Sequence, residues 1–159
     1  MTQMTLQDLI DLEAIRQLRA RYCLLLDALA WEDFETLFTP DCRFSVGSGD
    51  YEGAPAFVAA LSKNLAGELH VHVAQMPILE ITGPGKAKGF WSFNNRGALG
   101  HYQDEYVRGD DGAWRFSSMT MTWIVPPSEA LLRERKGQFA AVADRWRQLA
   151  GRWGRRSAN

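Results

Sequence analysis

The sequence predicts an α+β protein in which helices come first and a curved antiparallel sheet follows. Two observations carry this prediction. In roughly the first third of the 159 residues, the apolar positions recur every three or four residues, which is the helical period. From Leu69 onward they alternate with polar residues, and short turns join the alternating runs. Helices followed by consecutive strands indicate one α+β domain with a strongly curved sheet.

Three helices are predicted before the sheet. The first covers residues 6–30, and its last turn is apolar all round from Cys23 to Leu26, so we expect that turn to be enclosed. A short second helix covers residues 31–38 and stops before Pro40. A third covers residues 55–65, with Pro55 tolerated in its first turn.

The strand pattern begins with residues 42–46 and resumes in four runs, which are residues 69–81, 87–96, 101–108 and 114–125. GPG at residues 83–85 and DDG at residues 110–112 supply two of the turns. Pro126 and Pro127 end the sheet, and Ser128 can cap a C-terminal helix. We therefore expect one domain with a curved sheet over residues 1–127 and an amphipathic helix over residues 128–159, packed on the same domain.

Composition indicates a soluble cytoplasmic protein. Apolar residues make up 46% and charged residues 23%, and no apolar run is long enough to span a bilayer. The first residues are mixed and acidic, unlike a secretory signal. From Glu129 to the end, eight Lys/Arg accompany three Asp/Glu, but apolar residues recur there at helical steps. We interpret the arginines as the solvent-exposed face of a helix packed on the domain. We therefore expect neither a nucleic-acid nor a membrane partner.

Asp27 is the first candidate for chemistry, because it follows the enclosed turn directly. A single carboxylate here has a structural alternative, which is to cap or solvate the helix end. Tyr22 lies about 140° from Asp27 around an ideal helix. The two side chains can therefore meet only in a pocket that wraps around the helix end.

Two histidines form the second candidate. His70 and His72 share one face of a strand with Ala74. Such histidines are more often structural than catalytic. They could also bind a metal, but only the distant His101 offers a third ligand, so we expect no metal.

Alternation sorts the later strands into faces, and one face suits a pocket for an apolar ligand with a few oriented polar atoms. A plain core would produce nearly the same pattern. The candidate substrate-binding residues are Trp91, Phe93, Asn95, Gln103, Met119, Met121 and Trp123.

Four segments in order resemble SnoaL-like proteins of the nuclear-transport-factor-two-like superfamily, over residues 8–125. They are IRQLRARYCLLLDALAWEDFETLF, HVHVAQMPILEI, KGFWSF and GHYQDEYVRGDDGAWRF. The resemblance implies a curved antiparallel sheet that helices wrap into a cone with a deep central pocket.

Within this family the chain is similar to cofactor-free lyases, namely bile-acid dehydratase, scytalone dehydratase and hexachlorocyclohexane dehydrochlorinase. Tyr22 and Asp27 match the YxxxxD motif of the first, and His72 matches its pocket histidine. The resemblance implies that Asp27 orients His72, that His72 removes a proton from carbon, and that Tyr22 donates a hydrogen bond to a substrate oxygen.

The same resemblance places Asn95 and Gln103 at pocket positions as orienting groups. Two departures from these relatives bear on the substrate. An arginine that two of them carry on the last strand is absent, and Met119 and Trp123 stand at the corresponding positions. The tyrosine–aspartate pair that scytalone dehydratase carries at the helix end is Leu29 and Ala30 here. An acidic substrate is therefore disfavoured.

We expect a cofactor-independent, dehydratase-like lyase or an isomerase that acts on a hydrophobic, cyclic small molecule. The alternatives are a non-catalytic binding or assembly protein of the same fold, or the oligomerising subunit of a larger oxygenase. We also expect a homodimer or homotrimer, because Trp114 and Phe116 are predicted on the outer sheet face and Trp146 and Trp153 on the C-terminal helix.

Overall fold

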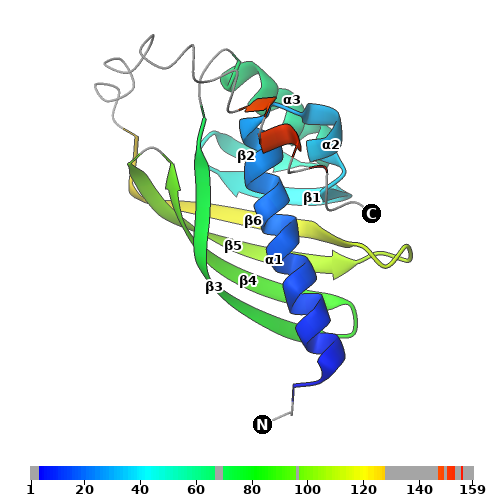
Figure 1. The fold of residues 1–159 in the computed structure, drawn as a ribbon. Helices are drawn as coiled ribbons and strands as arrows, with labels where there is room; N and C mark the ends of the chain where they lie inside the picture. The colour runs from blue at the N-terminus through cyan, green and yellow to red at the C-terminus, as the bar shows by residue number, and fades with distance from the viewer. Residues whose placement is uncertain are drawn as a thin grey trace.

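The computed structural model describes residues 4–66, 70–95, 97–127, 147–148, 150–152 and 155, and it confirms the α+β class. The helices and strands in chain order are α1 (Leu6–Asp27), α2 (Trp31–Glu35), β1 (Phe38–Val46), β2 (Gly49–Glu52), α3 (Ala54–Asn64), β3 (His72–Gly83), β4 (Lys86–Asn95), β5 (Ala98–Arg108) and β6 (Trp114–Val125) (Figure 1). No helix within the described ranges is long and apolar enough to cross a membrane.

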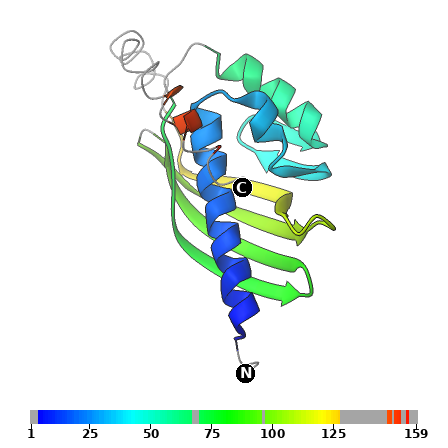
Figure 2. The same ribbon diagram turned by 45° about the vertical axis from the view of Figure 1, so that its right-hand side comes forward.

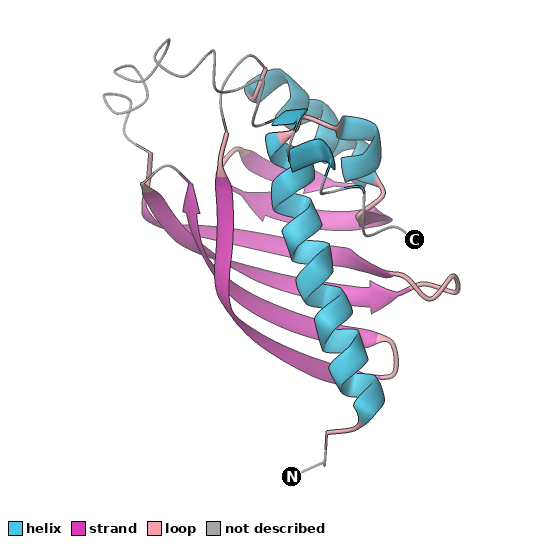
Figure 3. Ribbon diagram, in the orientation of Figure 1, coloured by secondary structure: helices cyan, strands magenta, loops and turns pink. Residues whose placement is uncertain are grey.

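One six-stranded sheet forms the body, in the order β2-β1-β6-β5-β4-β3. It is curved, and α1 lies across its concave face while α2 and α3 gather at the end where β1 and β2 lie (Figures 1 and 3). Turning the molecule shows the long strands bending around α1 (Figure 2). The core therefore lies between this helix and the inner face of the sheet, and a pocket can form only at an end that the helix leaves open.

The first helix begins and ends close to the positions predicted. Thr5 and Asp8 form a reciprocal cap. The Thr5 backbone N–H donates to the Asp8 side chain at 2.8 Å, and the Asp8 backbone N–H donates to the Thr5 side chain at 3.1 Å. The helix ends at Asp27, three residues before the predicted boundary, and Leu29 follows with a positive φ of 55°. The sharp exit turns the chain into α2 and leaves the Asp27 side chain at the helix end, facing β3.

Strand pairing differs from the predicted meander in one place. β1 and β6 run parallel, whereas the three pairs among β3, β4, β5 and β6 are antiparallel as predicted, and β1 also pairs antiparallel with β2. No short turn joins β1 to β6, so turn chemistry could not reveal their relative direction. The strand at Gly49–Glu52 was also not predicted, because its residues read as turn formers, and β1 begins at Phe38 instead of Cys42.

The prediction that Trp114 and Phe116 lie on the outer face is wrong. They are 5% and 0% exposed, and the indole Nε1 of Trp114 donates to Asp11 on α1 at 3.1 Å. The cause is a β-bulge: Glu105 pairs with Ser118 but Tyr106 pairs with Phe116, so β6 carries one extra residue. The bulge reverses the face on which the strand's first residues project. The homo-oligomer prediction thus loses these two residues as support.

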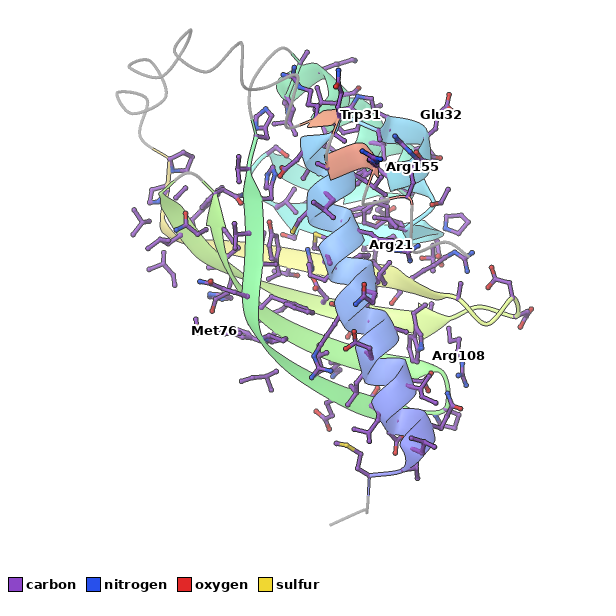
Figure 4. All side chains as sticks on the ribbon, viewed as in Figure 1. Arg21, Trp31, Glu32, Met76, Arg108 and Arg155 are labelled. Atoms are coloured by element: carbon purple, nitrogen blue, oxygen red, sulfur yellow. The ribbon has the colours of Figure 1, made fainter. Side chains whose placement is uncertain are left out.

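The predicted C-terminal helix, with Trp146 and Trp153, lies largely outside the described residues. Those that are described near the C-terminus are helical, and Ala150 is 1% exposed. Arg155 lies beside the C-terminal end of α1 (Figure 4), where it forms an ion pair with Asp33 of α2 at 3.3 Å. This part of the chain therefore packs on the helical end of the domain.

Candidate active site

Asp27 and His72 are in direct contact. The Asp27 side chain is 1% exposed, and its Oδ1 lies 2.6 Å from Nδ1 of the His72 ring. The His72 backbone N–H also donates to both carboxylate oxygens, at 3.1 Å each. One buried carboxylate at the end of α1 thus fixes both the backbone and the ring of the first residue of β3.

This geometry determines which nitrogen of His72 is available for chemistry. A carboxylate accepts hydrogen bonds, so Nδ1 carries the proton when the ring is neutral. Nε2 is then the unprotonated nitrogen. The His72 side chain is 12% exposed and forms part of a cavity wall, whereas Asp27 lies behind it. A histidine held in this way can act as a base toward a molecule in the cavity.

The cavity has a volume of about 400 Å³ and lies at the end of the sheet where α1 terminates. Its wall is mostly apolar, and none of its described lining residues is Asp, Glu, Lys or Arg. The lining consists of Leu26, Val46, Gly47, Phe57, Leu61, Leu65, Val71, Ala98, Met121, Trp123 and Pro127, with polar groups from Tyr22, Ser48, Asn64, His70, His72, Asn95 and Tyr102. Such a wall suits an uncharged, largely apolar molecule.

The predicted binding residues fall into three groups. Asn95, Met121 and Trp123 line the cavity, together with the candidate catalytic residues Tyr22 and His72.

Trp91, Phe93 and Met119 lie on the same inner face but are at most 4% exposed and belong to the core. Helix α1 covers this part of the concave sheet, so the face is open to a ligand only beyond the end of the helix. The indole Nε1 of Trp91, for example, donates to the Tyr106 hydroxyl at 2.9 Å.

Gln103 does not reach the cavity. It projects from the opposite face of β5, beside Lys88 and Phe90 of the neighbouring strand. Strand alternation puts Gln103 on one face with His101 and Glu105, and the buried Tyr102 and Asp104 show that the other face is the inner one. Its expected role as an orienting group is therefore not supported by its position.

Tyr102 is a cavity residue that the sequence did not indicate. It is 3% exposed, its ring centroid lies 6.2 Å from that of Tyr22, and its hydroxyl is hydrogen-bonded by the Asn95 side chain. Its neighbours in sequence gave no reason to prefer it over Tyr106, which points into the core. Only the position of the cavity along the strand distinguishes them.

Both cavity tyrosines are held in the protonated form. Burial raises the pKa of the Tyr22 hydroxyl well above its ordinary value, and burial likewise raises the pKa of Tyr102. The guanidinium of Arg19 opposes the shift, because it lies over the two rings at 4.6 and 4.3 Å from their centroids. The two hydroxyls thus stay hydrogen-bond donors at neutral and moderately alkaline pH.

Arg19 belongs to a buried network behind the cavity, which the sequence also did not reveal. Its guanidinium pairs with Asp104, and the Tyr106 hydroxyl donates to the same carboxylate at 2.6 Å. Burial, the largest single effect, would lower the pKa of Arg19, but attraction to Asp104 together with the three neighbouring tyrosines outweighs burial and raises the pKa. Arg19 is 1% exposed, so it supports the tyrosine rings and does not contact the cavity.

Metal ligands and thiols do not add to the site. Within the described residues, no group of three or more His, Cys, Asp or Glu side chains could hold a metal ion. Cys23 and Cys42 are free and buried, and burial raises their pKa to about 11 and about 12.

Structures of several proteins with the same fold have been determined. A protein from Novosphingobium aromaticivorans, provisionally named a scytalone dehydratase, superposes with a TM-score of 0.69 at 20% identity, over 77% of this chain and 89% of its own. A hexachlorocyclohexane dehydrochlorinase from Novosphingobium barchaimii gives 0.66 at 21% identity, over 76% and 92%. ActVI-ORFA from Streptomyces coelicolor gives 0.63 at 17% identity, over 70% and 96%.

At these identities the structures establish a shared fold and no more. Sequence comparison goes further, because residues 7–120 match the SnoaL-like domain. That match covers most of the chain and includes the end of α1, the start of β3 and the cavity residues of β4 and β5, and it ends before Met121 and Trp123 of β6. The protein is a member of the SnoaL-like family.

Proposed function

We propose that the protein is a cofactor-independent lyase or isomerase that removes a proton from carbon in a hydrophobic, cyclic small molecule. The observation that carries this proposal is the 2.6 Å contact between Asp27 Oδ1 and His72 Nδ1, at the wall of a mostly apolar cavity. Dehydratase and dehydrochlorinase names among structures of the same fold are consistent with it.

His72 Nε2 accepts the proton in the proposed reaction. The ring becomes an imidazolium, and the Asp27 carboxylate 2.6 Å from Nδ1 stabilises the new charge. A proton transfer of this kind contributes about 10²–10⁴-fold to the rate.

The electron pair left on carbon needs an acceptor, which is an adjacent carbonyl in an isomerisation or a leaving group in an elimination. Tyr22 is the proposed hydrogen-bond donor to the oxygen that gains charge, and its raised pKa keeps its proton in place before the reaction. A donor already positioned in an apolar cavity stabilises the charge without solvent reorganisation.

The wall of the cavity indicates the kind of substrate. Described lining residues carry no formal charge apart from what His70 and His72 acquire on protonation, so an ionic group would lose its hydration without gaining a partner. A volume of about 400 Å³ accommodates a molecule of two or three fused rings. We therefore propose a neutral, ring-containing substrate.

Hydrogen–deuterium exchange tests the proposed proton abstraction without knowledge of the natural substrate. The probe is 1-tetralone, a neutral bicyclic ketone, incubated in D₂O and followed by NMR at its α-carbon. We expect the wild-type protein to accelerate exchange, and His72→Ala and Asp27→Asn to reduce the acceleration by at least about 10²-fold. Gln103→Ala is the matched control, because Gln103 lies on the outer face, and it should keep the wild-type rate.

The alternative function, a non-catalytic binding protein, predicts a different result. Such a protein would bind 1-tetralone, detectable by quenching of Trp123 fluorescence, while exchange stayed at the rate of the buffer. Full acceleration by a correctly folded His72→Ala variant would also contradict the proposal, since another group would then be the base.

A further inference from the structure

Asn95 lies next to His72 in the wall of the cavity. The two residues are direct partners in the antiparallel ladder between β3 and β4, so their side chains project from the same face. Opposite residues of this kind have Cβ atoms about 4.5–5.5 Å apart. Whatever ligand atom Asn95 binds is therefore close to the atom that His72 contacts.

The side chain of Asn95 has one unused hydrogen-bonding atom. Its amide group hydrogen-bonds the Tyr102 hydroxyl, but Oδ1 is buried and accepts no hydrogen bond from any residue that the structure describes. Buried acceptors in proteins nearly always have a partner. An orphaned carbonyl oxygen in a cavity wall indicates that a ligand supplies the missing donor.

Tyr102 has the complementary capacity. A tyrosine hydroxyl can accept one hydrogen bond and still donate its own proton. The Asn95 side chain lies beside this hydroxyl in the cavity wall, so Tyr102 can accept from the amide and still donate its own proton to a ligand. Asn95 Oδ1 and Tyr102 O–H thus offer one acceptor and one donor, side by side, on a wall that is otherwise largely apolar.

An alcohol matches this pair, because a hydroxyl both donates and accepts. A ketone or ether oxygen only accepts, and a halogen substituent does not donate, so each would leave Asn95 Oδ1 unpaired. We propose that Asn95 and Tyr102 bind a hydroxyl group of a neutral substrate, and that this hydroxyl is the leaving group. The assignment rests on the proposed function and selects dehydration from the reactions that it allows.

The step balances as an elimination of water. His72 Nε2 takes a proton from the carbon adjacent to the carbon that bears the hydroxyl, and the C–H electron pair forms a carbon–carbon double bond. The C–O bond breaks, and its electron pair leaves with oxygen. Tyr102 gives its proton to that oxygen, so water departs while Asn95 Oδ1 holds the original O–H. Proton transfer from His72 to Tyr102 through solvent restores both groups.

Binding of three probes with one carbon skeleton tests the hydroxyl assignment. They are 2-tetralol, 2-tetralone and tetralin, each titrated by isothermal calorimetry. We expect wild-type protein to bind 2-tetralol at least about tenfold more tightly than the other two. Asn95→Leu removes both the donor and the acceptor of the side-chain amide at similar volume. It should bring the affinities for the three probes within about threefold of one another while leaving the affinity for tetralin unchanged. Tyr102→Phe should reduce the preference for 2-tetralol, because only the acceptor then remains.

Asn64→Leu serves as the matched control, because Asn64 lines the cavity but has no part in the proposed pair. It should keep the preference for 2-tetralol. Equal affinity of the wild type for all three probes, or an undiminished preference in Asn95→Leu, would overturn the proposal.

Failure of this inference can be distinguished from failure of the proposed function. Exchange of 1-tetralone protons depends on His72 and requires no leaving group, so it serves as the reference rate of each variant, Asn95→Leu included. The same variant should lose at least about 10-fold in converting 3-hydroxy-1-tetralone to 1-naphthol, followed by naphthol fluorescence. Loss of exchange in Asn95→Leu, with its affinity for 1-tetralone unchanged, would assign Asn95 to proton abstraction and contradict the hydroxyl role.

Discussion

At the residue scale, the Asp27 carboxylate binds the backbone N–H and the ring Nδ1 of the same histidine. A capping role for Asp27 would have directed its oxygens to the backbone of its own helix or of α2. Instead it joins two elements that are 45 residues apart. Its carboxylate favours the His72 tautomer with the proton on Nδ1. That tautomer leaves Nε2 unprotonated, as a base requires.

The tautomer can be observed directly. In the wild-type protein at neutral pH, ¹⁵N NMR of the His72 ring should show a protonated Nδ1 and an unprotonated Nε2. In Asp27→Asn the amide can donate to Nδ1, so the opposite tautomer should gain population and proton exchange of 1-tetralone should fall by at least about 10²-fold. A wild-type ring protonated at Nε2 alone would contradict the assigned geometry.

The two cysteines give a second prediction at this scale. Burial raises the pKa of Cys23 to about 11 and that of Cys42 to about 12, so little thiolate exists at pH 8. The folded protein should therefore react with a disulfide reagent far more slowly than the unfolded chain, which should release two equivalents of thiolate dye. Rapid reaction of either thiol at pH 8 in the folded state would show that the packing around it is open.

At the element scale, two β-bulges decide which side chains meet. One in β6 turns Trp114 and Phe116 inward, and another in β3, between Gln75 and Ile78, leaves Met76 and Ile78 68% and 72% exposed. Figure 4 shows Met76 projecting away from α1. A bulge shifts alternation by one residue without a distinct mark in the sequence. This is why periodicity predicted the strands but placed Trp114 and Phe116 on the wrong face.

Only part of the candidate site could be predicted from the sequence. Periodicity located the enclosed end of α1 and the shared face of Asn95 with its neighbours, and the family resemblance paired Asp27 with His72. The network of Arg19, Asp104 and Tyr106 could not be predicted, because its members are up to 87 positions apart and a buried arginine has the same appearance in sequence as a solvated one.

A pair of glycine substitutions tests the packing of the inner face. A Cβ at Gly100 would overlap the backbone oxygen of Thr122 and lie 2.5 Å from Cζ of Phe93. Gly100→Ala should therefore lower the free energy of unfolding by about 1–3 kcal/mol, measured by urea denaturation.

Gly83→Ala is the control for that measurement, because a Cβ there has no neighbour within 4 Å. Its effect should stay within about 0.5 kcal/mol. Equal effects of the two substitutions would contradict the register between β4, β5 and β6.

At the scale of the whole molecule, charged side chains dock α1 on the sheet at three points along its length. Asp11 accepts from Trp114 Nε1 at 3.1 Å and from Arg108 at 3.0 Å, Arg19 pairs with Asp104, and Asp27 binds His72. These three residues recur every eight positions, and each is turned about 80° around the helix from the one before, as the sheet curves around α1. They are all less than 9% exposed. The site at the end of the helix therefore depends on docking along all of it.

Asp104→Asn tests the central contact. The substitution keeps an acceptor for Tyr106 but leaves the charge of Arg19 buried and unpaired, which should cost about 3–5 kcal/mol of unfolding free energy. Asp33→Asn removes the exposed pair with Arg155 and should cost less than about 1 kcal/mol. A loss in Asp104→Asn no larger than in Asp33→Asn would show that Arg19 is not held as described.

Chemical rescue tests the central claim, that His72 is the base, most directly. In His72→Gly the missing ring leaves a space beside the buried Asp27 carboxylate, which can hold free imidazole in the same orientation. We predict that the variant exchanges 1-tetralone protons no faster than buffer, and that added imidazole restores exchange in a saturable manner. Acceleration that is linear in imidazole and equal to that of imidazole alone would contradict the assignment of His72 as the base.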